Sequence, residues 1–291
     1  MKLRGGLIPP LFFCTQLYNC TIILIVFQSG GVMKNILSLS KTSSLHYIKL
    51  ICRASVFLTA LVFYILTRVI EFEKEFHVLM LVVWIVYVVE MCLRFVPSRI
   101  ESRGCQKQFK HNYSPTCEKI IKEEHQWWRT ALVVCFWCLL NGAIAAVYYF
   151  GLIDKGIMIL ISLAYSVCDI ICILFFCPFQ SWILKNKCCG SCRIYNWDYA
   201  MMFTPLIFID SLYGWSLFGI SLLLLLKWEI TYRVHPEYFY PSTNEFLKCV
   251  NCKEKLCTHK KQLKTLWKHE SQRLQKLKEK IYNRSNTKTH D

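Results

Sequence analysis

The amino-acid sequence predicts an all-α integral membrane protein, and three observations support this fold class. The chain of 291 residues is 54% hydrophobic and 15% aromatic, whereas soluble domains are usually about 45–50% apolar. Its apolar residues gather in runs of about 20 residues with few charges, the length that a helix needs to cross a hydrocarbon core of ~30 Å. The net charge of +16 lies mainly between and after these runs. Such a distribution suits an anionic membrane surface, and no nucleic-acid partner is expected.

The first 32 residues are treated as an uncertain apolar extension. Two prolines interrupt their apolar run, and no cleavage pattern of small residues follows the basic start, so a signal peptide is not predicted. Gly30 and Gly31, shortly before Met33, are what a translated bacterial ribosome-binding site would encode. Met33 is therefore an equally good natural start, and residues 1–32 enter no functional argument.

Four full membrane spans are predicted between residues 51 and 177. Each is near 20 residues long and is bounded by charges or by the Trp and Tyr side chains that anchor helices at membrane interfaces. Trp127 and Trp128, for example, precede the third span. The predicted spans run from Ile51 to Ile70, from His77 to Val96, from Thr130 to Phe150 and from Gly156 to Cys177.

Lysine and arginine residues in the flanking segments predict the orientation of these spans. They are abundant before the first span, between the second and third, and after the fourth. In the two opposite loops, residues 71–75 and 151–155, acidic residues at least match the basic ones. Positive segments stay on the cytoplasmic side, so the sequence predicts a cytoplasmic (inner) membrane protein with its N-terminus inside.

The apolar segment from Tyr199 to Trp228 is too long for one untilted span and too short for two full ones. Its middle, from Asp210 to Trp215, is polar and contains a glycine, and a lysine-rich tail follows. A short helical hairpin or re-entrant pair that turns near Asp210 to Trp215 returns the tail to the inner side. One long tilted helix, which leaves the tail outside, is the alternative.

The predicted transmembrane domain, residues 33–228, is followed by a cytoplasmic cysteine-containing basic tail, residues 229–291. Between Gln262 and Tyr282, apolar residues recur at alternating spacings of three and four, which predicts the seam of a short coiled coil. That helix could mediate self-association, or its lysine-rich face could bind the anionic lipids of the inner leaflet. A solvated surface helix is the third interpretation.

Two C-x-x-C motifs on the predicted inner side, Cys189–Cys192 and Cys249–Cys252, predict a metal site. The two-residue spacer lets both sulfurs of a turn reach one metal, and two such pairs complete a tetrahedral zinc centre. A hairpin between the motifs would bring them to one face, despite their separation in the sequence. The candidate ligands are Cys188, Cys189, Cys192, Cys249, Cys252 and Cys257.

Three alternatives for the cysteines stay open. An iron–sulfur cluster also takes four thiolates, and Cys177 adds a further candidate ligand. Thiol–disulfide exchange is disfavoured because the motifs lie on the predicted reducing side, and the cysteines could also have no chemical role. Cysteines inside the spans, such as Cys168 and Cys172, are expected to be small buried hydrophobic residues. Cys105 and Cys117 are expected to be surface thiols.

Polar residues inside the predicted spans are the second group of candidates. Asp169 in the fourth span suggests a proton or ion pathway. The alternative is a structural role, in which a protonated Asp169 is hydrogen-bonded to Asn141 or to a serine. Asn141 is expected to link helices. Glu90 precedes Arg94 by one helical turn, which predicts an intrahelical ion pair.

The favoured function is a non-enzymatic membrane metalloprotein, in which zinc organises a cytoplasmic surface. A redox membrane protein with an iron–sulfur cluster and a small transporter that uses Asp169 are the alternatives. The sequence contains no nucleophile–base triad, phosphate-binding glycine loop or H-E-x-x-H helix, so no common hydrolase or nucleotide enzyme is predicted.

Overall fold

The computed structural model describes only part of the chain, which divides into two compact units, Met1–Glu254 and Lys255–Asp291. Every regular element among the described residues is a helix, so the expected all-α fold is confirmed for them. The predictions for residues 1–32, and most of the predicted helix in residues 262–282, lie outside the described residues. The described residues are 41–70, 73–96, 104–105, 112–116, 127–186, 188, 192–252, 256–257, 260–261, 265 and 272.

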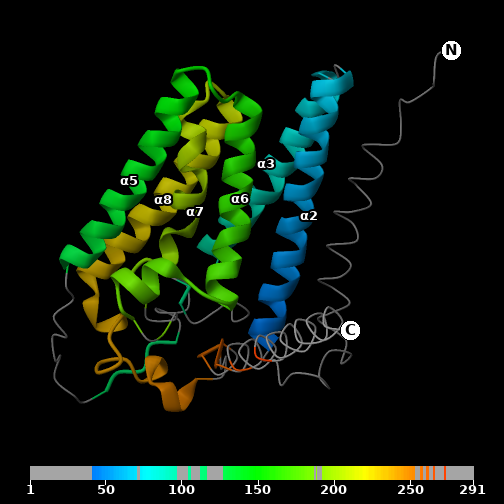
Figure 1. The fold of residues 1–291 in the computed structure, drawn as a ribbon. Coiled ribbons are helices and arrows are strands. Elements are labelled where there is room, and N and C mark those ends of the chain that lie inside the picture. The colour runs from blue at the N-terminus through cyan, green and yellow to red at the C-terminus, as the bar shows by residue number, and fades with distance from the viewer. Residues whose placement is uncertain are drawn as a thin grey trace, which may run out of the picture. The chain divides into compact units, whose positions relative to one another are not determined.

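Six α-helices are described, all within the first unit (Figure 1). They are α2 (Lys41–Ile70), α3 (Glu73–Phe95), α5 (Trp127–Tyr149), α6 (Lys155–Leu174), α7 (Asp198–Phe203) and α8 (Leu212–Val234). Short helical turns connect or follow them: η1 (Phe179–Ile183), η3 (Tyr195–Trp197), η4 (Thr204–Phe208), η5 (Pro236–Tyr238), η6 (Glu245–Leu247) and η7 (Cys249–Asn251).

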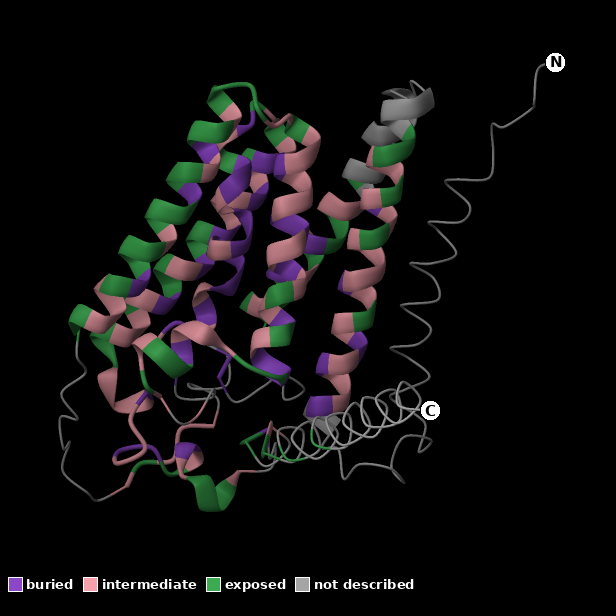
Figure 2. Cartoon of the chain, viewed as in Figure 1, coloured by how far each residue is buried: buried purple, intermediate pink, exposed green. Residues whose placement is uncertain are grey.

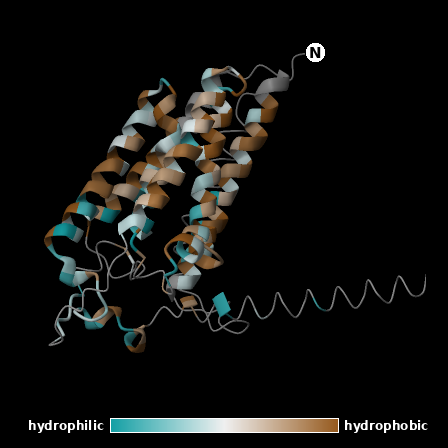
Figure 3. Cartoon of the chain, turned by 60° about the vertical axis from the view of Figure 1, so that its left-hand side comes forward, coloured by the Kyte–Doolittle hydropathy of each residue, from teal (hydrophilic) through white to brown (hydrophobic). Residues whose placement is uncertain are grey.

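Three of the described helices are long and apolar enough to cross a membrane: Ser43–Leu66 within α2, Trp127–Tyr149 and Lys155–Leu174. The outer face of α5 carries exposed apolar side chains along its length (Figure 2), and Leu139 is 74% exposed. Hydrophobic residues also dominate the lengths of the bundle helices in Figure 3. Continuous exposed apolar surface of this kind is unfavourable in water and favourable against lipid.

Two of the helix ends that differ from the predicted span boundaries have an explanation in the sequence. α2 begins at Lys41 rather than near Ile51. Its first turns contain polar residues, of which Ser43 and His46 are buried, and a search for apolar runs does not detect a buried polar segment. α6 ends at Leu174 rather than Cys177. Pro178 disfavours helical backbone in the residue before it, and the chain then turns into η1.

The long helices pack around α7, and α2 runs antiparallel to α6 whereas α3 and α8 run in the same direction, as the contacts of Trp84 with Ser216 and of Phe95 with Lys227 show. α2 packs against α6, α3 packs against α8, and α7 with η4 lies between α6 and α8. The core of the bundle contains Tyr199, Met202 and Phe203 of α7, together with Met91 of α3 and Met158 of α6. α7 is therefore the buried centre of the first unit, and it is only six residues long.

The chain reverses direction between η4 and α8, so that α7 and α8 form the two arms of a helical hairpin. Ser162 Oγ of α6 donates a hydrogen bond to the Met202 carbonyl (2.8 Å), which fixes the first arm. At the base of the hairpin, the Trp228 indole donates to the Arg193 carbonyl (3.3 Å), and Arg193 pairs with Glu229. The two ends of the hairpin therefore lie together.

The hairpin turns at Ile209–Ser211, at the start of the predicted turn, and Gly214 and Trp215 already belong to α8. Gly214 serves packing rather than the turn. A Cβ atom at this position would lie 3.2 Å from both Cβ and the carbonyl oxygen of Leu206. The missing side chain lets α8 approach η4 closely.

Gly214→Ala is therefore expected to destabilise the protein, because the backbone oxygen of Leu206 cannot move aside as a side chain can. Overpacking of this kind costs about 1–3 kcal/mol, which outweighs the gain of about 1 kcal/mol from replacing glycine in a helix. Gly219→Ala in the same helix is the matched control, since no atom lies within 4 Å of the place where its Cβ would be. Thermal unfolding in detergent measures both variants; equal stabilities would contradict the close contact.

Three segments that are distant in the sequence meet at the end of the unit where α8 finishes. Thr116 N donates to the Thr243 carbonyl (3.1 Å) and Glu245 N donates to the Ser114 carbonyl (2.9 Å), which joins residues 112–116 to the segment after α8. Asn196 Nδ2 donates to the Gly104 carbonyl (2.8 Å). The loop between α3 and α5, the segment after α6 and the segment after α8 therefore share one end.

Candidate functional site

A single buried guanidinium joins three helices in the middle of the first unit. Arg53 of α2 is 7% exposed. Its Nη1 donates to Asp169 Oδ2 of α6 (3.0 Å) and to the Ser166 carbonyl (3.0 Å). Its Nη2 donates to both carboxylate oxygens of Glu90 in α3 (3.2 Å each). Because the planar guanidinium has five N–H donors, it can hold two carboxylates at once.

Glu90 pairs across to α2 rather than within its own helix. Lys49 Nζ lies 2.9 Å from Glu90 Oε1, and Arg53 occupies both oxygens from the next turn of α2. The predicted intrahelical pair between Glu90 and Arg94 is therefore wrong. Two cations one turn apart on α2 outcompete the single cation on α3 for this carboxylate.

Arg94 is paired with α7 instead. Its two terminal nitrogens donate to the two carboxylate oxygens of Asp198, with 3.1 Å between Nη1 and Oδ1. The ring of Tyr199 lies beside both guanidiniums, with centroid distances of 4.4 Å to Arg94 and 5.9 Å to Arg53. Cation–π attraction over this ring couples the two ion pairs.

The buried charge network, defined as Lys49, Arg53, Glu90, Arg94, Asp169 and Asp198, is balanced, with three cations and three anions. The balance matters because an unpaired charge inside an apolar bundle is costly. Each helix that contributes to the network therefore depends on the others for neutralisation.

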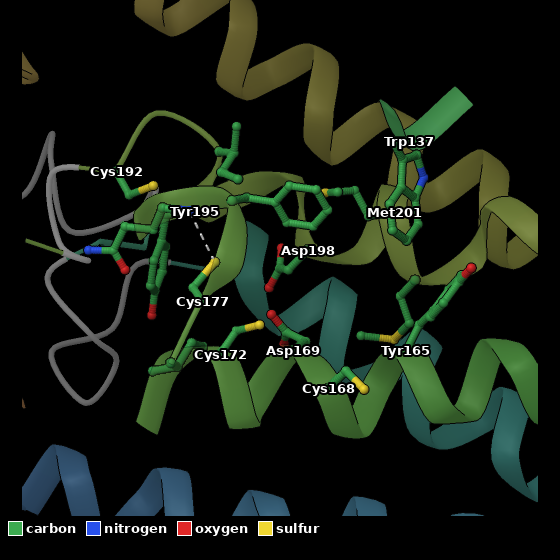
Figure 4. Close-up of a pocket in the computed structure, with 15 residues that line it drawn as sticks. Trp137, Tyr165, Cys168, Asp169, Cys172, Cys177, Cys192, Tyr195, Asp198 and Met201 are labelled. Carbon is green, nitrogen blue, oxygen red and sulfur yellow. Dashed lines mark hydrogen bonds between the residues drawn. The ribbon is translucent and has the colours of Figure 1, made fainter. Parts of the chain in front are cut away.

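A cavity of about 140 Å³ adjoins the network on the side of α6 that faces α5 and α7 (Figure 4). Asp169 and Asp198 line it together with aromatic rings from α5, α6 and the segment after α6. Of the two carboxylate oxygens of Asp169, only Oδ2 accepts a hydrogen bond from the described residues, and its donor is Arg53. The other carboxylate oxygen has capacity for a ligand.

Sulfur is concentrated around this cavity. Of the 15 residues that line it, four are cysteines and two are methionines, although the whole chain of 291 residues has 17 cysteines and 7 methionines. Cys172 and Cys177 line the same cavity, and Cys177 Sγ accepts a hydrogen bond from the Gln180 backbone N–H (3.4 Å). Cys168 and Cys172 are therefore cavity residues rather than the simple packing residues that their positions in an apolar run predicted. The sulfur residues are Cys168, Cys172, Cys177, Cys192, Met201 and Met202.

The predicted metal ligands are distributed over different parts of the chain. Cys192 is buried beside Val133 and Ile194 and lines the cavity, while Cys189 lies outside the described residues. Cys249 and Cys252 share the turn η7, where Cys252 N donates to the Cys249 carbonyl (3.1 Å).

The remaining ligand candidates, Cys188 and Cys257, add no metal-binding group among the described residues. Cys188 is partly exposed and its backbone N–H donates to Asn186 Oδ1 (3.2 Å), whereas Cys257 belongs to the second unit. Within the described ranges, no group of three or more His, Cys, Asp or Glu side chains has an arrangement that could hold a metal ion. Zinc and an iron–sulfur cluster at the two motifs stay predictions.

Two other predicted polar positions have different surroundings from those expected. Asn141 is buried, and its Nδ2 donates to the Trp137 carbonyl of its own helix (2.9 Å). Cys105, expected to be a surface thiol, is 2% exposed. At the neighbouring Gly104, the missing side chain lets the Tyr195 ring approach within 2.9 Å of where a Cβ would be. Cys117 lies outside the described residues.

Sequence reasoning selected Asp169 and Glu90 but missed Arg53, Arg94, Asp198 and Tyr199 as site residues. One signal was available: Arg53 lies within a predicted span, where a charge needs a partner. On the sequence alone, this arginine served only as a marker of orientation. Comparison with models of protein families, with curated proteins and with solved structures finds no match for the chain.

Proposed function

We propose that the protein is a multi-pass membrane carrier for a small ligand, with the Arg53–Asp169 pair as its mobile element and the adjoining cavity as its binding site. One observation carries this proposal: a partly buried carboxylate, ion-paired to a buried arginine, lines a cavity inside an apolar helical bundle. Ionisable groups inside a membrane protein typically mark substrate or ion pathways. Apolar cavities with a few convergent polar groups are the usual ligand sites.

The proposed topology has four full spans, α2, α3, α5 and α6, and a membrane-embedded hairpin of α7 with η4 and α8. The N-terminus and the tail are then on the cytoplasmic side of the inner membrane. Two observations support this arrangement. The base of the hairpin joins Arg193 to Glu229, and the three segments that meet at that end are the lysine- and arginine-rich ones, as the positive-inside rule requires.

The network offers a two-state element for such a carrier. A ligand or a proton that neutralises Asp169 weakens its bond to Arg53, while Glu90 continues to hold Arg53 against α3. Arg53 is then joined to α6 only through the Ser166 carbonyl, so α6 can shift relative to α2 without leaving the guanidinium unpaired. The difference in contacts between the two states is what allows a ligand to change their populations.

Accessibility of Cys172 to an impermeant maleimide tests the carrier proposal, with labelling read by mass spectrometry in right-side-out and inside-out vesicles. A carrier exposes its cavity to each side in turn, so Cys172 should be labelled from both sides, and Asp169→Asn should change the ratio of the two rates. Cys249, on the proposed cytoplasmic side, is the matched control and should be labelled only in inside-out vesicles. Labelling of Cys172 from one side alone in both proteins would refute the carrier.

A structural zinc site is the second candidate function, favoured by the turn that places Cys249 and Cys252 together. In this proposal, zinc joins this motif to Cys189 and Cys192 and organises a cytoplasmic surface for a protein partner or anionic lipids. Metal analysis of purified protein should give about one zinc per chain that is lost in Cys189→Ser/Cys252→Ser. A brown, iron-containing sample would favour the iron–sulfur alternative, and metal retained in the double variant would exclude both.

A further inference from the structure

The sulfur residues around the cavity indicate the class of ligand that it can hold. Figure 4 shows the side chains of Cys172 and Cys177 directed toward the same part of the cavity, with the carboxylate of Asp169 next to Cys172. The two thiols come from the last turn of α6 and from the residue before Pro178, and both line the cavity. Cys192 and the two methionines line the same space.

The chemistry of sulfur ligands separates the possible metals. Thiolate and thioether ligands are soft and select Cu(I), whereas carboxylate and carbonyl oxygens suit Mg²⁺ and Ca²⁺. Structural zinc requires four ligands in a tetrahedron, and no group of three His, Cys, Asp or Glu side chains in the described ranges meets the requirements of a metal site. Two thiols suffice for a monovalent soft ion with low coordination number.

We propose that the cavity binds a soft monovalent metal ion, Cu(I), between the sulfurs of Cys172 and Cys177, with methionine and cysteine sulfur around it. The proposal names the ligand of the cavity and in that respect rests on the proposed carrier function. Apart from Asp169, Asp198 and Gln180, the other residues that line the cavity are apolar or aromatic, so the sulfur atoms replace the water molecules that the ion loses on entry.

The charges in the site connect metal binding to the buried charge network. Cu⁺ displaces a proton from one thiol, which forms a Cu–S bond and leaves the complex with no net charge, while the second thiol binds as a neutral ligand. The released proton has an acceptor in the same cavity, the Asp169 carboxylate oxygen that receives no hydrogen bond from the described residues. Protonated Asp169 loses its ionic attraction to Arg53, so an occupied cavity weakens the bond between α2 and α6.

Site-specific protection of thiols tests this proposal on the purified full chain in detergent with a non-thiol reductant. Ag(I), a redox-inert probe of Cu(I) sites, is added at one equivalent per chain, and alkylation by N-ethylmaleimide is quantified for each cysteine by mass spectrometry. We expect at least tenfold slower alkylation of Cys172 and Cys177. Cys135 and Cys138, an exposed pair on α5, are the internal controls and should react at unchanged rates.

Titration with Cu(I) supplied from a chromophoric chelator gives an independent measurement. Cys172→Ser/Cys177→Ser should bind one ion fewer than the wild type, whereas Cys135→Ser/Cys138→Ser should bind as many. Both counts are repeated with Cys249→Ser/Cys252→Ser, so that Cu(I) at the surface motif is subtracted. Unchanged alkylation of Cys172 and Cys177 with Ag(I), or an unchanged count in the Cys172 and Cys177 variant, would overturn the proposal.

The outcomes separate this inference from the carrier function. Metal protection combined with labelling of Cys172 from one side only would support a soft-metal site and refute a carrier. Labelling from both sides without metal protection would leave a carrier whose ligand is not a soft metal ion.

Discussion

Replacing Arg53 with methionine is expected to have the largest effect on stability of any single change in the charge network. The substitution keeps most of the side-chain volume but leaves Asp169 without its ion-pair partner and Glu90 with Lys49 alone. Removing one partner of a buried ion pair typically costs about 3–5 kcal/mol. Thermal and denaturant unfolding in detergent should therefore show a strongly destabilised protein, with reduced yield from membranes.

Two comparisons make this expectation specific. Asp169→Asn should cost less than Arg53→Met, because the guanidinium keeps both bonds to Glu90. Arg233→Met removes an exposed arginine near the end of α8 and should leave stability within about 0.5 kcal/mol of the wild type. If Arg53→Met and Arg233→Met unfolded at the same temperature, the network would not hold the helices together.

Arg94→Met is the second substitution with a large expected effect, because it leaves the Asp198 carboxylate unpaired at the start of α7. The Asp198 side chain is 4% exposed, so the expected cost is again about 3–5 kcal/mol. The cation–π contact of Arg94 with Tyr199, at 4.4 Å, is lost at the same time. Since α7 is the centre of the core, loss of its anchor should also lower the unfolding cooperativity.

A double-mutant cycle separates lost pairing from lost packing. Arg94→Met/Asp198→Leu removes both charges and leaves no unpaired ion, so it should be more stable than either single variant, with a coupling energy of about 1–3 kcal/mol. Additive effects of the two substitutions would show that the pair does not carry the stability. The same cycle with Arg193 and Glu229 examines the base of the hairpin.

The helices of the bundle were the predictable part of this structure. α5 and α6 follow the predicted spans closely at their start, because uniform apolar character and flanking charges are local properties of the sequence. The first turns of α2 were missed because they contain polar residues, and Ser43 and His46 among them are nevertheless buried. The reversal at Ile209–Ser211 is near the predicted turn, but the role of Gly214 as a contact point depends on Leu206 of the preceding arm.

The site was predictable only as isolated residues. Asp169 and Glu90 are conspicuous as acids within apolar runs, yet their partner Arg53 lies 116 and 37 residues away from them in the sequence. No local pattern determines which of the many basic residues reaches which acid. The cavity is less predictable still, because it depends on where η1 and η3 fold back over α6 and bring Cys177 and Cys192 beside Cys172.

The unequal arms of the hairpin have a consequence for how the protein is made. The first arm, α7 with η4, covers residues 198–208 and begins with a charged Asp198, so it is too short and too polar to enter a bilayer alone. In the proposed topology, it inserts together with α8, after synthesis of the whole hairpin. Arg94 and Ser162 stay without their α7 partners until then. Asp198, Met201 and Met202 of α7 line the cavity, so a nascent chain cut before α8 lacks this side of the cavity.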